Sequence, residues 1–152
     1  MQWVTRARPK TDRIACPWLI LRFIDPEARF LYVPAEQVLD TAVTAGGRSF
    51  DAPGADYHHK PAPDGGEWCT FETLLHGFDL TGDPALVELA RIVHAADVTG
   101  QIDTHPLGPG LLATGVGGLD VEADDYRLLE RALFVYDALY AYCQRHPAGV
   151  PA

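Results

Sequence analysis

Side chains that bind metal ions in proteins are concentrated in the middle of the sequence, between residues 58 and 97. In chain order they are His58, His59, Cys69, Glu72, His94 and Asp97. Zinc is bound through nitrogen and sulfur, whereas iron and manganese accept histidine together with carboxylate. The order contains no C-x-x-C and no H-E-x-x-H motif. It therefore indicates a metal site without naming the metal, and the alternative that His58 and His59 are an ordinary surface pair stays open.

His94 and Asp97 belong to the helix that the sequence predicts most clearly. Asp83 is a typical N-cap, proline follows it, and an apolar stripe runs to Asp97. An aspartate at the end of an apolar stripe needs a partner. Asp97 could cap the next turn or pair with Arg91. Alternatively, His94 and Asp97, which are neighbours on the helix surface, face a pocket as ligands or as an acid–base pair.

Cys16 and Arg13 are candidates for binding an anion. Proline is favoured at the first position of a helix, so Pro17 predicts a helix that starts after Cys16. Free backbone N–H groups at a helix start bind oxyanions, and the helix dipole together with Arg13 would lower the pKa of the Cys16 thiol. A small buried side chain is the alternative for Cys16.

The remaining pattern predicts one α+β domain, dominated by helices and with a small sheet. Strands are expected over residues 3–5, 29–33 and 49–52. Helices are expected over 17–24, 36–44, 70–75, 83–97 and 124–144. Residues 6–13 and 53–66 are predicted to be loops, and 100–118 a loop with one short buried helix.

The last helix is apolar on nearly all sides between residues 132 and 142, which predicts a buried helix. Asp137 lies in this segment, and a buried carboxylate needs a cation or several donors. We expect a salt bridge from Arg13 or Arg22. The aromatic side chains of the same helix could also form a homodimer interface.

Composition and charge exclude several classes of protein. The net charge of −9 argues against direct binding of nucleic acid, which needs a clustered basic face. No apolar segment is long enough for a membrane span, and no signal peptide is evident, so a cytoplasmic location is expected. The three cysteines are widely spaced and form no disulfide framework. Basic residues are nevertheless frequent near the N-terminus, where an anion could bind. They are Arg6, Arg8, Lys10, Arg13, Arg22 and Arg29.

Several segments resemble the C-terminal domain family of ChrB, a protein of chromate resistance. They are RPKTDRIACPWLI at residues 8–20, FD at 50–51, the histidine loop, CTFE at 69–72, IVHAAD at 92–97 and YDALY at 136–140. The resemblance covers nearly the whole chain and implies a single ChrB C-terminal-like domain over residues 1–152. It also implies a link to chromate response, because longer members of the family are associated with the regulation of chromate operons.

Together these observations predict a metal-binding protein of the chromate-resistance type. His59, Glu72 and Asp97 would hold Fe, Mn or Zn, and His94 would be a fourth ligand or a catalytic proton-transfer group. Arg13 and Cys16 would bind a small anion such as chromate. Two functions stay open: a metal-dependent enzyme that acts on a small anionic substrate, and a sensor of chromate or another oxyanion without catalysis. A third, chromate reduction at Cys16, would need an external reductant.

Overall fold

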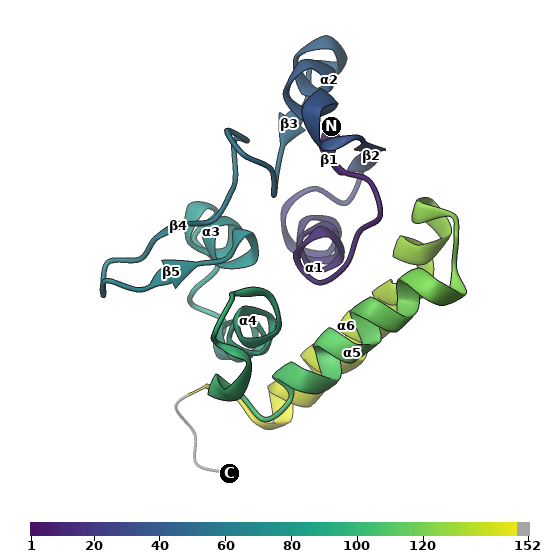
Figure 1. Cartoon of the computed structure of the whole chain (residues 1–152). Coiled ribbons are helices and arrows are strands. Elements are labelled where there is room, and N and C mark those ends of the chain that lie inside the picture. Colours follow the sequence, from purple (N-terminus) through teal and green to yellow (C-terminus); the bar gives the residue numbers. More distant parts are fainter. Residues whose placement is uncertain (149–152) are drawn as a thin grey trace.

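The computed structural model describes residues 1–148, which form six α-helices and a small sheet (Figure 1). This confirms the predicted helix-dominated α+β domain. Helix α1 (Asp12–Leu19) lies at the centre. It is surrounded by α3 (Thr70–Gly77), α4 (Pro84–Asp97) and α6 (Asp125–Arg145). Helix α2 (Val38–Ala45) lies on the far side of the sheet. No helix in the described part of the chain is both long enough and apolar enough to cross a membrane.

The larger sheet has three parallel strands in the order β2 (Arg29–Val33), β1 (Gln2–Arg6) and β3 (Arg48–Ser49). Side chains alternate between the two faces of a strand. Trp3 accordingly packs into the main core with α1, and Val4 packs into a second core with α2 (Val38–Ala45). A short 3-10 turn, η2 (Ala35–Gln37), precedes α2, and Gly46 ends it in a left-handed conformation.

The first helix, α1 (Asp12–Leu19), begins five residues before the predicted start. Pro17 lies inside it, so the expectation that Pro17 opens the helix is wrong. Proline has no N–H to bond to the carbonyl four residues earlier, here that of Arg13. The Tyr32 hydroxyl donates to that carbonyl instead, at 3.3 Å. The chain then continues into a π-helical turn, η1 (Ile20–Ile24).

The segment with most of the candidate ligands forms a hairpin and two helices. The hairpin pairs β4 (Lys60–Pro61), which lies inside the loop predicted over residues 53–66, with β5 (Glu67–Trp68), which follows that loop. Helix α3 (Thr70–Gly77) follows directly, and α4 (Pro84–Asp97) starts at the predicted cap. The Asp83 carboxylate accepts the N–H groups of Ala85 and Leu86 at 2.9 and 3.3 Å.

After a 3-10 turn, η3 (Ile102–Thr104), the chain forms α5 (Gly108–Val121). The prediction of a loop with one short buried helix over residues 100–118 is wrong in the length and burial of the helix, which has 14 residues and buries Gly108 and Leu111. Glycine disfavours an isolated helix, but here it permits close packing against α4. A Cβ at Gly108 would lie 2.7 Å from the Cβ of Ala95. Arg8 also satisfies the end of α5, since its Nη2 donates to the carbonyls of Leu119 and Glu122 at 2.8 and 3.0 Å.

Helix α6 (Asp125–Arg145) is capped by Asp124 and lies behind α5 in the view of Figure 1. The predicted salt bridge of Asp137 is formed with Arg22, through contacts of 3.0 and 2.9 Å, and Trp18 donates to the same carboxylate. The predicted burial is wrong: the side chain of Asp137 is 44% exposed and Phe134 is 76% exposed. One face of α6 therefore contacts solvent.

Candidate metal centre

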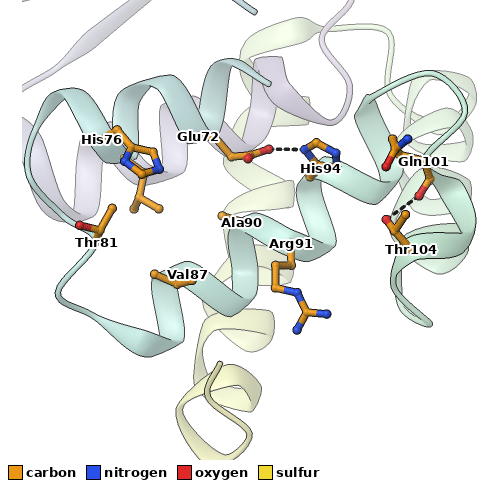
Figure 2. A pocket seen from close by; sticks show the side chains of 10 residues that line it. Glu72, His76, Thr81, Val87, Ala90, Arg91, His94, Gln101 and Thr104 are labelled. Atoms are coloured by element: carbon orange, nitrogen blue, oxygen red, sulfur yellow. Dashed lines mark hydrogen bonds and ion pairs between the residues drawn. The ribbon is translucent and has the colours of Figure 1, made fainter. Parts of the chain in front are cut away.

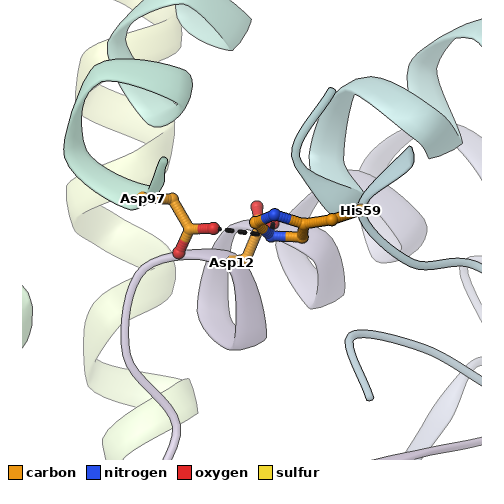
Figure 3. Close-up of side chains that lie close together, drawn as sticks. All are labelled: Asp12, His59 and Asp97. Carbon is orange, nitrogen blue, oxygen red and sulfur yellow. Dashed lines mark ion pairs between the residues drawn. The ribbon is translucent and has the colours of Figure 1, made fainter. Parts of the chain in front are cut away.

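Asp12, His59 and Asp97 meet at one point, although they come from three separate segments (Figure 3). His59 Nε2 lies 2.9 Å from Asp97 Oδ2 and 3.3 Å from Asp12 Oδ2. One ligand atom from each residue lies within 4.8 Å of the others. Two carboxylates and an imidazole in this arrangement can bind a divalent cation.

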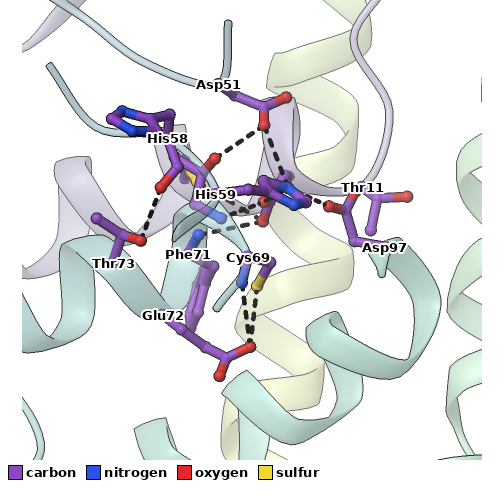
Figure 4. A network of polar contacts seen from close by, with 12 residues as sticks. Thr11, Asp51, His58, His59, Cys69, Phe71, Glu72, Thr73 and Asp97 are labelled. Atoms are coloured by element: carbon purple, nitrogen blue, oxygen red, sulfur yellow. Dashed lines mark hydrogen bonds and ion pairs between the residues drawn. The ribbon is translucent and has the colours of Figure 1, made fainter. Parts of the chain in front are cut away.

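Asp12 is held by the junction of two helices. It is the first residue of α1 and is fully buried. Its Oδ2 accepts the N–H of Thr70 at 2.7 Å. Its Oδ1 accepts the N–H of Phe71, which is labelled in Figure 4, at 3.3 Å. The carboxylate thus satisfies free N–H groups at the start of α3. A carboxylate oxygen has more than one lone pair, so these bonds leave Asp12 able to bind a cation.

Asp97 and His59 are positioned from the other two sides. Asp97 is the last residue of α4, and His59 directly precedes β4. Glu67, on the paired strand β5, places Oε1 at 3.3 Å from His59 Nδ1. A carboxylate in this position holds Nδ1 protonated and turns Nε2 toward the cluster.

The electrostatic balance of the cluster depends on His59. Hydrogen bonds to Asp12 and Asp97 raise the pKa of His59 from 6.5 to about 11, although burial opposes this. Burial, and then the charge of Asp97, raise the pKa of Asp12 well above its ordinary value, although the hydrogen bond from His59 lowers it. At neutral pH the imidazolium is therefore the cation that compensates the carboxylates.

Asp51 connects this cluster to two arginines. It has a left-handed backbone, with φ 50°, and the Thr70 hydroxyl donates to its Oδ1 at 2.8 Å. Arg6 Nη2 and Arg13 Nε approach Asp51 Oδ2 at 3.2 and 3.4 Å. Arg13 also donates to the Ala7 carbonyl at 3.2 Å. Burial, followed by the neighbouring charge of Arg6, lowers the pKa of Arg13.

A cavity of about 300 Å³ opens beside the cluster. Its lining residues are Arg6, Asp51, Ala52, Pro53, His58 and His59. Arg6, with a side chain 36% exposed, is the cation that borders this cavity, whereas Arg13 is only 17% exposed. Of the basic residues noted near the N-terminus, Arg6 is thus the one placed to meet an anion here.

Glu72 and His94, two further predicted site residues, lie together but outside the cluster. His94 Nδ1 is in close contact with Glu72 Oε1 (Figure 2). Glu72 also accepts from the backbone N–H of Cys69, which caps α3. The first turn of α3 therefore directs Glu72 back over its own N-terminus and toward α4, and Asp12 occupies the place expected for Glu72.

The expectation for Cys16 is corrected by the course of α1. Cys16 lies in the middle of this helix and has no exposed surface. Burial, and then the charge of Asp12, raise the pKa of its thiol well above 9.0. The helix dipole cannot act as predicted, because the helix start is at Asp12 and not at Cys16.

Asp12 is the ligand candidate that sequence reasoning missed. It occurs in the RPKTDRIACPWLI segment, within the loop predicted over residues 6–13. Thr11, directly before it, has a strained backbone with φ of 46° at the start of α1. That conformation is a property of the folded backbone and is not visible in the residue types.

Comparison with known proteins agrees with the resemblance seen in the sequence. The family model described as ChrB, C-terminal domain, matches residues 3–143. The chain belongs to the ChrB C-terminal domain family. Protein ChrB of Cupriavidus metallidurans, strain CH34, is 36% identical to it over 142 residues, which is 93% of this chain and 40% of the relative. This ChrB-type domain thus spans less than half of that longer protein. No solved structure matches the chain.

Proposed function

We propose that this ChrB C-terminal domain binds one divalent metal ion between Asp12, His59 and Asp97, and a small oxyanion such as chromate beside it. The observation that supports the metal site most directly is the spacing of the ligand atoms. Ligands at about 2.1 Å from a metal, with bond angles of 90–110°, lie roughly 3.0–3.4 Å from one another. The distance of 3.3 Å from His59 Nε2 to Asp12 Oδ2 lies within this range, and the distance of 2.9 Å to Asp97 Oδ2 lies just below it.

The donor set favours Mn(II) or Fe(II) over Zn(II). Two carboxylates and one imidazole form a harder site than the nitrogen and sulfur sites typical of zinc. Both cysteines near the cluster are fully buried, and burial, the largest cause in each case, raises the pKa of each thiol. The metal would take the place of the proton on His59, since a histidine ligand must be neutral.

The anion would enter through the cavity that Arg6 borders. A guanidinium group binds the oxygens of an oxyanion through parallel N–H donors. A metal ion bound at His59 would supply a second positive charge at the same cavity and could polarise an oxygen of the anion. Chromate is the anion that the family's link to chromate resistance suggests.

The metal site is tested by measuring the metal content of untagged protein after reconstitution with Mn(II), Fe(II) or Zn(II). We expect close to one equivalent in the wild type and a large loss in Asp12→Asn, His59→Gln and Asp97→Asn. His94→Gln should keep its metal, because His94 pairs with Glu72 outside the cluster. Asp137→Asn, which removes only the surface pair with Arg22, is a second control.

The proposal fails if the reconstituted wild type holds much less than one equivalent of each metal. It also fails if the three ligand variants bind as much metal as Asp137→Asn. Because Asp12 caps α3, each variant needs a thermal unfolding measurement. His59→Gln changes the most exposed of the three side chains and is therefore the variant least affected by a folding defect.

Calorimetric titration with chromate and with sulfate separates the metal-dependent function from a metal-free sensor. The metal-dependent function predicts chromate binding only to the loaded protein, and weaker binding in Arg6→Ala. A metal-free sensor would bind chromate without a metal ion, and the Arg13→Ala variant would no longer bind chromate. Turnover of chromate by the loaded protein would identify an enzyme.

A further inference from the structure

The Glu72–His94 pair lies between two cavities that are separate from the metal centre. One has a volume of about 470 Å³ and the other of about 480 Å³, and Glu72, His94 and Gln101 border both. Figure 2 shows the imidazole between Glu72 and Gln101, at the wall of the first cavity. Cavities of this size hold small organic ligands.

The orientation of His94 is fixed by a carboxylate that is itself held. Glu72 Oε1 accepts from the Cys69 backbone N–H at 3.4 Å and from the Cys69 thiol at 3.3 Å. The same oxygen contacts His94 Nδ1, so Nδ1 donates to the carboxylate, and in the neutral imidazole Nε2 is left as an acceptor. Within residues 1–148, Nε2 has no hydrogen-bond partner, and the side chain is 21% exposed.

The rest of the first cavity combines an apolar wall with one strong cation. Leu75, Val87 and Ala90 contribute the apolar surface. Arg91, one helical turn before His94, is 57% exposed and uses only Nη1 in its contact with Glu88, at 2.8 Å. The remaining N–H groups of its guanidinium are available for an anionic ligand.

We propose that this cavity is a second binding site, for a small organic carboxylic acid that also carries a hydroxyl group. Arg91 binds the carboxylate, the apolar wall contacts the body of the ligand, and His94 Nε2 accepts a hydrogen bond from the hydroxyl. Glu72 acts as a positioning residue, because it fixes the proton on Nδ1 and directs Nε2 to the cavity. This site is independent of the proposed metal function.

The test uses 4-hydroxyphenylacetate as a probe, together with two analogues that each lack one of its groups. Phenylacetate lacks the hydroxyl, and 4-(2-hydroxyethyl)phenol lacks the carboxylate. Amide NMR spectra of the full chain are recorded during titration with each compound. We expect shifts at Thr81, Gln101 and Thr104, which line the cavity, and roughly tenfold weaker binding of each analogue.

Matched variants then assign each group of the ligand to a side chain. His94→Gln should remove the preference for 4-hydroxyphenylacetate over phenylacetate, and Arg91→Ala should remove the preference for the carboxylate. Glu72→Gln should weaken hydroxyl recognition while the cavity persists. Arg131→Ala, which removes another exposed arginine in an ion pair, should bind all three compounds like the wild type.

Two results would overturn the proposal. One is the absence of shifts at the cavity with any of the three compounds. The other is binding in which His94→Gln and Arg91→Ala keep both preferences, as expected if the pair only joins α3 to α4. Metal content measured on the same samples keeps the outcomes distinct, because both variants should load metal normally even if the cavity binds nothing.

Discussion

At the scale of single residues, His59 is the most informative group in the domain. Its Nε2 faces Asp12 and Asp97, and its Nδ1 faces Glu67. The imidazole therefore joins the carboxylates of Asp12 and Asp97 to the exposed hairpin β4–β5. If the cluster binds a metal ion as proposed, a change in the hairpin should alter metal binding through this one ring.

Glu67→Ala is expected to weaken metal binding by about 10–100-fold, because it removes the carboxylate that orients His59. Competition with a coloured chelator measures the affinity. Asp64→Ala is the control, since Asp64 caps the turn of the same hairpin through Gly66 and does not contact His59. Equal losses in both variants would mean that the hairpin, and not the carboxylate, determines affinity.

The sequence supplied part of this site. His59 and Asp97 were predicted as ligands, and they do meet. Glu72 was grouped with them because it lies between them in sequence, but the capping turn of α3 directs it to His94. Asp12 reaches the cluster because its carboxylate binds the backbone of Thr70, far along the chain. Contacts of this kind depend on how helices pack, which local patterns do not encode.

At the scale of elements, Arg8 joins the end of α5 to the start of α6. Its guanidinium binds the carbonyls of Leu119, Glu122 and Ala123, and its backbone N–H and Nη1 both donate to Asp125. A cation at the C-terminal end of a helix also interacts favourably with the helix dipole. The two helices are thereby fixed to the loop that leads to Asp12.

Arg8→Lys is expected to lower the free energy of unfolding by about 1–2 kcal/mol, because an ammonium group cannot reach several carbonyls at once. Chemical denaturation measures the change. Arg29→Ala, at an exposed position of β2, should change stability little. A loss for Arg8→Lys no larger than that for Arg29→Ala would contradict the role of the guanidinium.

Glu88 and His105 fix α4 to the segment before α5. His105 Nδ1 accepts the Leu107 N–H at 3.1 Å, so its Nε2 donates to Glu88 at 2.7 Å. Arg91 binds the other oxygen of Glu88. Burial alone would raise the pKa of Glu88, but the hydrogen bonds from His105 and Arg91 outweigh it and lower the pKa below 4.5.

A carboxylate whose pKa is lower in the folded state than in the unfolded state stabilises the fold at any pH above the unfolded-state pKa. That stabilisation is lost as the pH falls through the folded-state pKa. Glu88→Gln should therefore be less stable than the wild type at neutral pH, by about 1–2 kcal/mol. The difference should shrink as the pH falls below 4.5. Urea denaturation across this pH range measures it, and a difference that is independent of pH would refute the electrostatic cause.

Helices and strands were predicted well where local signals are strong, as at the Asp83 cap of α4. The two main errors share a cause. Pro17 and the glycines of α5 disfavour a helix in isolation, yet tertiary contacts compensate for both. The Tyr32 hydroxyl binds the carbonyl that Pro17 leaves free, and Gly108 allows α5 to pack closely on α4.

At the scale of the whole molecule, the prediction of a homodimer depends on the exposed face of α6. Phe134 and Tyr142 are 76% and 48% exposed, and they line a shallow apolar cavity with Leu107 and Leu139. If this face joins two copies, Phe134→Glu should give a monomer at concentrations where the wild type is dimeric. Sedimentation velocity measures both, and a monomeric wild type would remove the prediction.

The three ligand candidates lie at residues 12, 59 and 97, so the chain must close long loops before they can meet. Loop closure of this kind is a late event in folding. A metal ion should consequently leave the refolding rate almost unchanged and slow unfolding instead. The reason is that its three ligands come together only after the transition state for folding. The benefit of the ion would then be a longer lifetime of the native state, visible in stopped-flow kinetics.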